Sequence, residues 1–192
     1  MGYLKLIIGP MFAGKSTELI SSANRYEQID KSVMAINHII NDRYGSTKIS
    51  THDQKTYDKC YMMSDLNDVE MLHKDVFNKA GIIIIEELQF FENAFAYIKK
   101  WVDEDDKIVI AAGLDGDFNR EPFGDVLKLI PIADEVKKLS AFCKRCGDGT
   151  PAHFTKRIVK SKSKTLVGSS DKYEAVCRKH YHQPIASINI LI

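Results

Sequence analysis

A glycine-rich segment near the N-terminus has the residue types and the spacing that bind phosphate. It fits the pattern G-x-x-x-x-G-K-S and lies between an apolar run and a stretch of polar and apolar residues that is expected to form a helix. Glycine permits left-handed backbone conformations, so successive N–H groups can curl around an anion. Lys15 is expected to reach the β- and γ-phosphates, and Ser16 to offer its hydroxyl to Mg²⁺. The pattern therefore predicts a nucleoside triphosphate site formed by Gly9, Pro10, Met11, Phe12, Ala13, Gly14, Lys15, Ser16 and Thr17.

Two adjacent carboxylates, Glu86 and Glu87, follow the wholly apolar segment Ile82–Ile85. Consecutive side chains of a strand point to opposite faces of a sheet, so the two acids can have different roles. One is expected to face the metal ion and its waters, and the other to face an incoming nucleophile as a general base. The alternative is an acid pair that is simply solvated at the end of a strand.

Four residues in the C-terminal quarter have the spacing of metal ligands. They form the pattern C-x₂-C, thirty residues, then C-x₂-H, with Cys143, Cys146, Cys177 and His180. Three thiolates and one imidazole suit tetrahedral Zn²⁺, and a closed four-ligand site favours a structural role over a catalytic one. His182 and His153 remain alternatives for the fourth ligand.

The elements that position these residues follow from the hydrophobic pattern. Strands alternate with helices, which predicts an α/β fold with a parallel sheet and right-handed crossovers. Strands are expected at 3–8, 31–37, 81–87, 106–114 and 134–143, and helices at 14–29, 66–78 and 93–105. The polar, turn-rich segment 38–54 is expected to be a loop.

Length and composition set the class of protein. The chain has 192 residues, enough for one domain with a small appendage, which we place at 1–140 and 141–192. A tail of this size usually needs a metal or disulfide to be stable. With 27 basic and 26 acidic residues, the chain has no charge excess that would imply nucleic acid as a main partner. No secretory signal or membrane-length apolar run is seen, so we expect a cytoplasmic protein without a membrane partner.

Taken together, the motifs resemble those of the cellular and poxvirus-type thymidine kinases, the zinc-containing P-loop family. The resemblance extends in order from about residue 3 to 181 and rests on GPMFAGKSTEL, NDRY with THD, EELQFF, LDGDFNREPFG, FTKR and GSSDKYEAVC. It implies a P-loop (RecA-like) parallel sheet flanked by helices, with a small zinc-stapled C-terminal domain that carries a lasso loop. It also implies transfer of the γ-phosphoryl of ATP to the 5′-hydroxyl of thymidine or deoxyuridine, giving the 5′-monophosphate (dTMP from thymidine).

The resemblance assigns roles to individual residues. Glu87 would be the general base, with Lys15 and Arg43 as further catalytic residues, and Ser16, Glu86 and Asp42 would serve Mg²⁺. The nucleoside would be bound by Met11, Phe90, Leu114, Phe118, Phe123, Thr155, Thr165, Leu166, Val167, Gly168 and Tyr173, the lasso being the loop from about Ile158 to Gly168. The resemblance also implies feedback inhibition by dTTP and assembly into a homotetramer.

The sequence departs from the family pattern at four points. Glu86 stands where aspartate is usual, and Leu88 replaces a common glycine, which is expected to narrow the pocket. The acid near Arg43 is directly adjacent to it, whereas in the family pattern it stands two positions before the arginine. Asp42 and Asn41 therefore both remain candidates for binding the metal. His180 replaces a frequent cysteine. Two rival functions are a kinase for another nucleoside and a nucleotide-dependent switch that transfers no phosphate.

Overall fold

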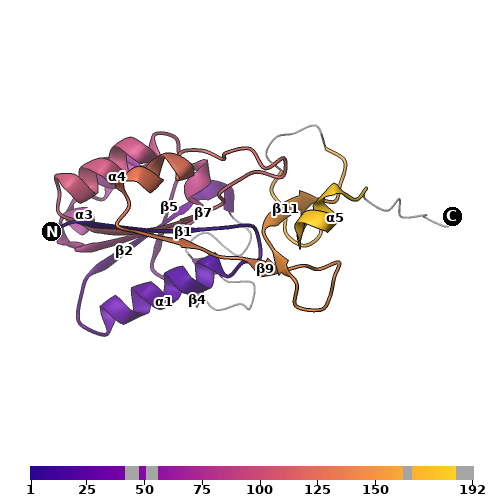
Figure 1. Cartoon of the computed structure of the whole chain (residues 1–192). Helices are drawn as coiled ribbons and strands as arrows, with labels where there is room; N and C mark the ends of the chain where they lie inside the picture. The colour runs from indigo at the N-terminus through magenta and orange to yellow at the C-terminus, as the bar shows by residue number, and fades with distance from the viewer. Residues whose placement is uncertain (42–47, 51–55, 162–165, 185–192) are drawn as a thin grey trace.

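The structure, a computed structural model, describes residues 1–41, 48–50, 56–161 and 166–184. It consists of an α/β body, built around one parallel sheet, and a smaller C-terminal module beside it (Figure 1). The N-terminus lies at the end of the body that is far from this module. The predicted α/β class and parallel sheet are confirmed.

Six strands form the main sheet, and all their pairings are parallel. Their order across the sheet is β5-β2-β6-β7-β1-β8. Segments that the sequence predicts to be strands supply five of the six. Four of these segments are short apolar runs, and residues such as isoleucine and valine suit a sheet covered on both faces. The bounds are β1 Tyr3–Ile8, β2 Val33–His38, β5 Cys60–Met63, β6 Ile82–Ile85, β7 Ile108–Gly113 and β8 Glu135–Lys138.

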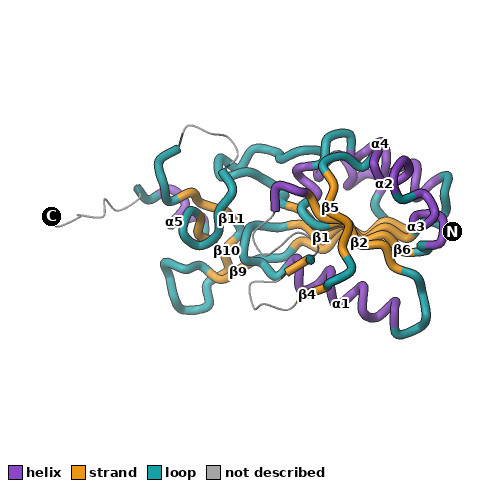
Figure 2. Tube along the Cα trace, turned by 180° about the vertical axis from the view of Figure 1, so that it is seen from behind, coloured by secondary structure: helices purple, strands orange, loops and turns teal. Residues whose placement is uncertain are grey.

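Helices cover both faces of this sheet (Figure 2). Helix α1 (Lys15–Glu27) packs on one face, against Ile82 and Ile84 of β6. On the other face, the core contains Ile83 and Ile85 together with residues of the remaining helices, because alternate residues of a strand face opposite ways. These helices are α2 (Asn67–Leu72), α3 (Lys74–Lys79), α4 (Ala94–Asp103) and the 3₁₀ helix η3 (Val126–Ile132); shorter 3₁₀ turns are η1 (Ile39–Asn41) and η2 (Leu88–Phe90).

Three sequence-based expectations about elements differ from the structure, and one strand was missed. The segment 38–54, expected to be a loop, contains η1 and the strand residues Ile49–Ser50. The helix expected at 66–78 is broken at His73, whose φ of −129° and ψ of 29° lie outside the helical region, so α2 and α3 are separate. The strand expected at 134–143 ends at Lys138, and residues 141–142 join another sheet. Strand β5 was not predicted, because its sequence Cys-Tyr-Met-Met lacks the β-branched run that marks β6, a strand of the same length.

The C-terminal module consists of two antiparallel strand pairs and a short helix. Strand β9 (Ala141–Phe142) pairs with β10 (Pro151–Ala152), and β11 (Phe154–Arg157) pairs with β12 (Tyr173–Val176), followed by α5 (Arg178–His182). Its small core packs against Phe12 and Ala13 of the phosphate loop. A further pair, β3 (Ile49–Ser50) with β4 (Thr56–Tyr57), lies beside α1. The module therefore touches the segment predicted to bind phosphate, and the domain limits at 140 and 141 stay a prediction.

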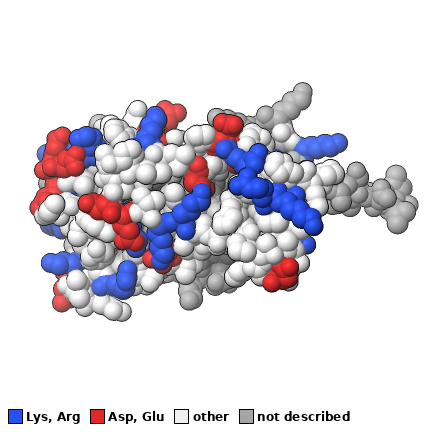
Figure 3. Space-filling view, in the orientation of Figure 1, with Lys and Arg blue, Asp and Glu red and all other residues white. Residues whose placement is uncertain are grey.

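Charge is distributed unevenly over the face shown in Figure 3. Acidic and basic side chains are mixed over the α/β body, whereas a group of basic side chains lies where the body adjoins the C-terminal module. In the part of the chain that the structure describes, no helix has the length and apolar character needed to cross a bilayer.

Candidate active site

The glycine-rich loop connects β1 to α1 as the sequence predicts. Gly9 has a φ of 144° and Gly14, at the N-cap of α1, a φ of 79°, both in the range that favours glycine. The loop thus ends at the N-terminus of a 13-residue helix, where free N–H groups and the positive end of the dipole favour an anion. The backbone has the form expected of a phosphate-binding loop.

Gly9 is also held by a close backbone contact, which gives a stability prediction. A Cβ atom added there would lie 2.4 Å from the Leu139 carbonyl oxygen, whereas one added at Gly14 would meet nothing within 4 Å. We expect Gly9→Ala to lower the free energy of unfolding by about 3 kcal/mol, and Gly14→Ala, the matched control, by only about 1 kcal/mol. Urea denaturation of both variants checks this, and equal losses would contradict it.

Lys15 and Ser16 point toward the acidic end of β6. The Lys15 amine donates to the Pro10 carbonyl oxygen over 2.7 Å, and the Ser16 hydroxyl donates to Glu86 Oε1 over 2.8 Å. Burial lowers the pKa of Lys15, and the neighbouring carboxylates, Glu87 first, oppose that shift. Lys15 and Ser16 of the loop pattern therefore lie near the two acids that the sequence analysis identified.

Glu86 is a buried carboxylate with one unsatisfied oxygen. It is 5% exposed, and its Oε2 has no hydrogen-bond partner among the described residues. Burial, and then the charge of Glu87, raises the pKa of Glu86 to about 8, against the hydrogen bond from Ser16 and the charge of Lys15. A buried oxygen without a donor is a position that a cation can satisfy.

Glu87 lies in a different environment from Glu86, as expected, but the alternation of side chains along a strand is not the cause. Strand β6 ends at Ile85, and Glu87 adopts a left-handed conformation (φ 55°, ψ 38°) at the start of η2. The alternation of a strand therefore does not separate the two acids; the backbone turn does. The turn points the Glu87 carboxylate at Gln89, whose amide Nε2 donates to Glu87 Oε2 over 2.5 Å.

A cavity of about 260 Å³ joins the phosphate loop, the two acids and the C-terminal module. Most of the residues expected in the phosphate and nucleoside sites line it: Met11, Phe12, Ala13, Gly14, Lys15, Ser16, Thr17, Glu86, Glu87, Phe90, Leu114, Phe118, Phe123, Thr155, Leu166, Val167 and Tyr173. Gly9, Pro10 and Gly168 do not line it. Asp42, Arg43 and Thr165 lie outside the described residues.

Three lining residues were not predicted: Gln89, Gly116 and Asp117. Gln89 could have been predicted from the sequence, because it stands in the segment EELQFF beside the proposed base. Its side chain can both donate and accept hydrogen bonds. Leu88, in contrast, was expected to narrow the pocket. It is fully buried in the main core and does not line the cavity, so that expectation is wrong.

Aromatic side chains form one wall of the cavity. The rings of Phe90 and Phe123 meet edge to face, with centroids 5.5 Å apart. The Arg157 guanidinium lies 3.6 Å from the centre of the Phe118 ring and donates to the Tyr173 hydroxyl over 3.1 Å. These contacts fix flat apolar surfaces of a size that suits a nucleobase or sugar.

Hydrogen bonds connect the strands of the C-terminal module to the phosphate loop and to Leu166. The Met11 N–H donates to Thr155 Oγ1 over 3.0 Å, and the Tyr173 hydroxyl donates to the Leu166 carbonyl oxygen over 2.8 Å. Residues that are more than 140 positions apart in the chain thereby share one site.

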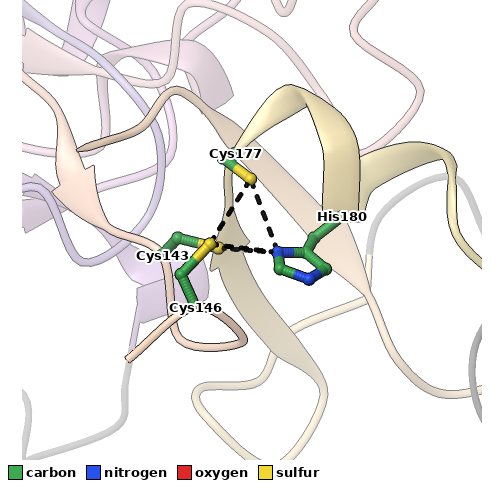
Figure 4. A group of neighbouring side chains, drawn as sticks. All are labelled: Cys143, Cys146, Cys177 and His180. Carbon is green, nitrogen blue, oxygen red and sulfur yellow. Dashed lines mark hydrogen bonds between the residues drawn. The ribbon is translucent and has the colours of Figure 1, made fainter. Parts of the chain in front are cut away.

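The four expected metal ligands converge in the module (Figure 4). The Nδ1 atom of His180 lies 3.4, 3.3 and 3.4 Å from the sulfurs of Cys143, Cys146 and Cys177, and the last two sulfurs are 3.8 Å apart. Tetrahedral zinc with ordinary bond lengths requires about 3.5 Å between nitrogen and sulfur and about 3.8 Å between sulfurs. The cluster fits zinc, and it identifies His180 rather than His153 or His182 as the fourth candidate ligand.

The surroundings of the cluster favour the thiolate form, which zinc requires, at Cys143 but not at Cys146, whose pKa is raised to about 11 by burial and by its hydrogen bond with Cys143. Burial by itself would raise the pKa of Cys143, but hydrogen bonds from the backbone of Cys177 and Cys146 and from His180 lower it to about 6. A thiolate binds zinc without first losing a proton.

Fold and site together define a P-loop protein of the α/β class with a zinc-ligand cluster beside its nucleotide site. Comparison with known proteins identifies the family. The model of the thymidine kinase family matches residues 2–181, so the chain belongs to that family.

Individual relatives agree with this assignment. Thymidine kinase a of Arabidopsis thaliana is 41% identical over 181 residues, which are 94% of this chain and 75% of the relative. The thymidine kinase of Myxoma virus (strain Uriarra) is 40% identical over 94% of this chain and 96% of its own. That of Oryza sativa subsp. japonica is 39% identical over 94% of this chain, which spans 66% of the rice protein.

Proposed function

We propose that this protein is an ATP-dependent thymidine kinase, which transfers the γ-phosphoryl of ATP to the 5′-hydroxyl of thymidine and yields dTMP and ADP. The observation that carries the proposal is that one cavity is lined both by the phosphate loop and by Glu87 with an aromatic wall. A triphosphate and an acceptor hydroxyl can therefore meet in it. Family membership supports the same reaction.

The phosphate loop would hold the triphosphate through its backbone N–H groups, with the Lys15 amine on the β- and γ-phosphates. For this the amine leaves the Pro10 carbonyl oxygen, which it contacts over 2.7 Å in the structure. Mg²⁺ bound with ATP would neutralise phosphate charge. Ser16 and Glu86 fit it, because they offer a hydroxyl and a buried carboxylate oxygen that lacks a donor. Asp42 is added to this set from the sequence alone.

Glu87 would act as the general base. The 5′-hydroxyl gives its proton to the Glu87 carboxylate as the hydroxyl oxygen forms its bond to the γ-phosphorus, and the bond from that phosphorus to the leaving ADP oxygen breaks. Arg43 would support the transferred group, as the family resemblance implies. Most of the rate gain would come from positioning and charge neutralisation, since phosphoryl transfer needs little covalent help.

The nucleoside would lie against the aromatic wall. Phe90, Phe118 and Phe123 would contact the base and sugar, with Met11, Leu114, Thr155 and Tyr173 around the thymine methyl group. Backbone groups from Thr165 to Gly168 would bind the base edge, a role that rests on the resemblance. Because a methyl group alone contributes only about 1–3 kcal/mol of discrimination, deoxyuridine is expected to be accepted as well.

A substrate panel tests this proposal. Purified protein with Mg²⁺ and γ-labelled ATP is offered thymidine, deoxyuridine, deoxycytidine and deoxyguanosine in parallel. We expect label on the first two nucleosides and, under the same conditions, at least about 10²-fold less on the others. Preferred labelling of deoxycytidine or deoxyguanosine would mean a kinase for another nucleoside. ATP binding without label on any nucleoside would favour a nucleotide-dependent switch.

Two further properties follow only from the resemblance. These are feedback inhibition by dTTP, which would span both halves of the cavity, and assembly into a homotetramer. A cytoplasmic location, expected from the sequence, is proposed as well. The zinc ion is proposed to be structural, since four protein ligands close its coordination shell.

A further inference from the structure

We propose that Gln89 is a positioning residue for phosphoryl transfer, which holds the Glu87 carboxylate in a fixed place relative to the end of β7. This inference rests on the proposed function, and it adds a residue that neither the loop pattern nor the acid pair indicates. Gln89 is 3% exposed and lines the cavity between the two elements that it connects.

The nitrogen and the oxygen of the Gln89 amide each make a hydrogen bond, and the two bonds together fix the orientation of the amide. Its Nε2 donates to Glu87 Oε2 over 2.5 Å, and its Oε1 accepts the Leu114 N–H over 3.0 Å. An ionised carboxylate can only accept and a backbone N–H can only donate, so the amide cannot be turned over without losing both bonds. Gln89 therefore links the proposed base to Leu114, a residue of the expected nucleoside site.

The backbone packs closely around Gln89. A Cβ atom at Gly124, where φ is 59°, would lie 2.4 Å from the Gln89 carbonyl oxygen, and one at Gly113 would lie 3.1 Å from Oε1. Gly113 thus lets the end of β7 approach the Gln89 side chain, and Gly124 lets the loop that carries Phe118 and Phe123 approach the Gln89 backbone. A buried side chain that is bonded at both ends loses little further freedom when substrate binds.

The left-handed turn at Glu87 makes such support necessary. A non-glycine residue with a φ of 55° is uncommon, and its backbone alone does not select one side-chain position. With the Gln89 bond, one carboxylate oxygen is held and the other stays available to accept a proton. Without it, the carboxylate is free to rotate away from the acceptor hydroxyl, and misplacement by about 1 Å costs up to about 10²-fold in rate.

The test is a double-mutant cycle with Gln89→Met and Glu87→Gln. Methionine keeps the volume of glutamine and removes both hydrogen bonds. If Gln89 acts through the carboxylate, Gln89→Met lowers kcat about 10- to 100-fold with the KM for ATP within about twofold of wild type, and costs less than about threefold once Glu87→Gln is present. The control is Leu88→Met, a buried neighbour that faces the core; we expect wild-type kcat from it.

A second variant keeps the inference testable if Gln89→Met does not fold. Gln89→Asn retains a neutral amide, but the side chain is one methylene shorter and cannot reach both Glu87 and the Leu114 N–H. We expect about the same loss of kcat, with an unfolding midpoint closer to wild type than that of Gln89→Met. Equal, multiplicative losses in both backgrounds, or full activity of either Gln89 variant, overturn the inference while the kinase proposal stands. A folded wild-type protein that phosphorylates no nucleoside overturns both.

Discussion

Replacing Glu87 with glutamine is expected to lower kcat by at least about 10²-fold, because the amide cannot take the proton of the acceptor hydroxyl. The substitution keeps the size of the side chain, and no residue of the phosphate loop depends on Glu87 for a described hydrogen bond. ATP binding is therefore expected to stay within about threefold of wild type. Steady-state kinetics and equilibrium ATP binding, measured on the same preparation, check the two halves of this prediction.

The matched control is Glu92→Gln, which removes an exposed carboxylate five residues further along. It should leave kcat unchanged, since Glu92 does not line the cavity. Glu87→Gln with wild-type kcat would mean that Glu87 is not the base. The buried Glu86, with its free oxygen, would then be the next carboxylate to consider.

The second large effect is expected at the zinc-ligand cluster. Cys146→Ser should abolish stoichiometric zinc binding and lower the free energy of unfolding by more than about 4 kcal/mol, because the module has only a few small core residues besides the cluster. That core also packs on Phe12 and Ala13 of the phosphate loop. Loss of zinc should therefore weaken binding of ATP as well as of thymidine.

Metal content measured by mass spectrometry, together with urea denaturation, checks this expectation. Cys60→Ser provides the control, since Cys60 is a buried thiol on β5, away from the cluster. It should retain one zinc ion per chain and cost about 1 kcal/mol. One zinc ion per chain in Cys146→Ser would show that the ion is held elsewhere.

The sequence predicts well those features that depend on neighbouring residues. The loop from Gly9 to Ser16 is recognisable because its geometry is set by two glycines and the start of a helix. The zinc ligands are recognisable because the two members of each pair are separated by only two residues. The apolar runs of β1, β6 and β7 identify buried strands, since a parallel sheet covered on both faces needs them.

Features that depend on contacts between distant residues were missed or left open. The two-residue strand β10 was missed, and β9 was predicted as part of the preceding strand, because only the pairing of β9 with β10 defines this second sheet. His180, His153 and His182 differ in sequence only by position, and the distances to three sulfurs separate them. Gln89 reads as one polar residue among aromatics until its bonds to Glu87 and Leu114 are seen.

The most direct test of the central claim is to count both products of one reaction. Protein with bound zinc is mixed with Mg²⁺, γ-labelled ATP and thymidine, and ADP and labelled dTMP are measured together over time. The account predicts one dTMP for each ADP, with no ADP formed above background when thymidine is omitted. ADP that appears without dTMP, or no turnover from folded protein that binds ATP, would contradict the claim that this cavity transfers phosphate to thymidine.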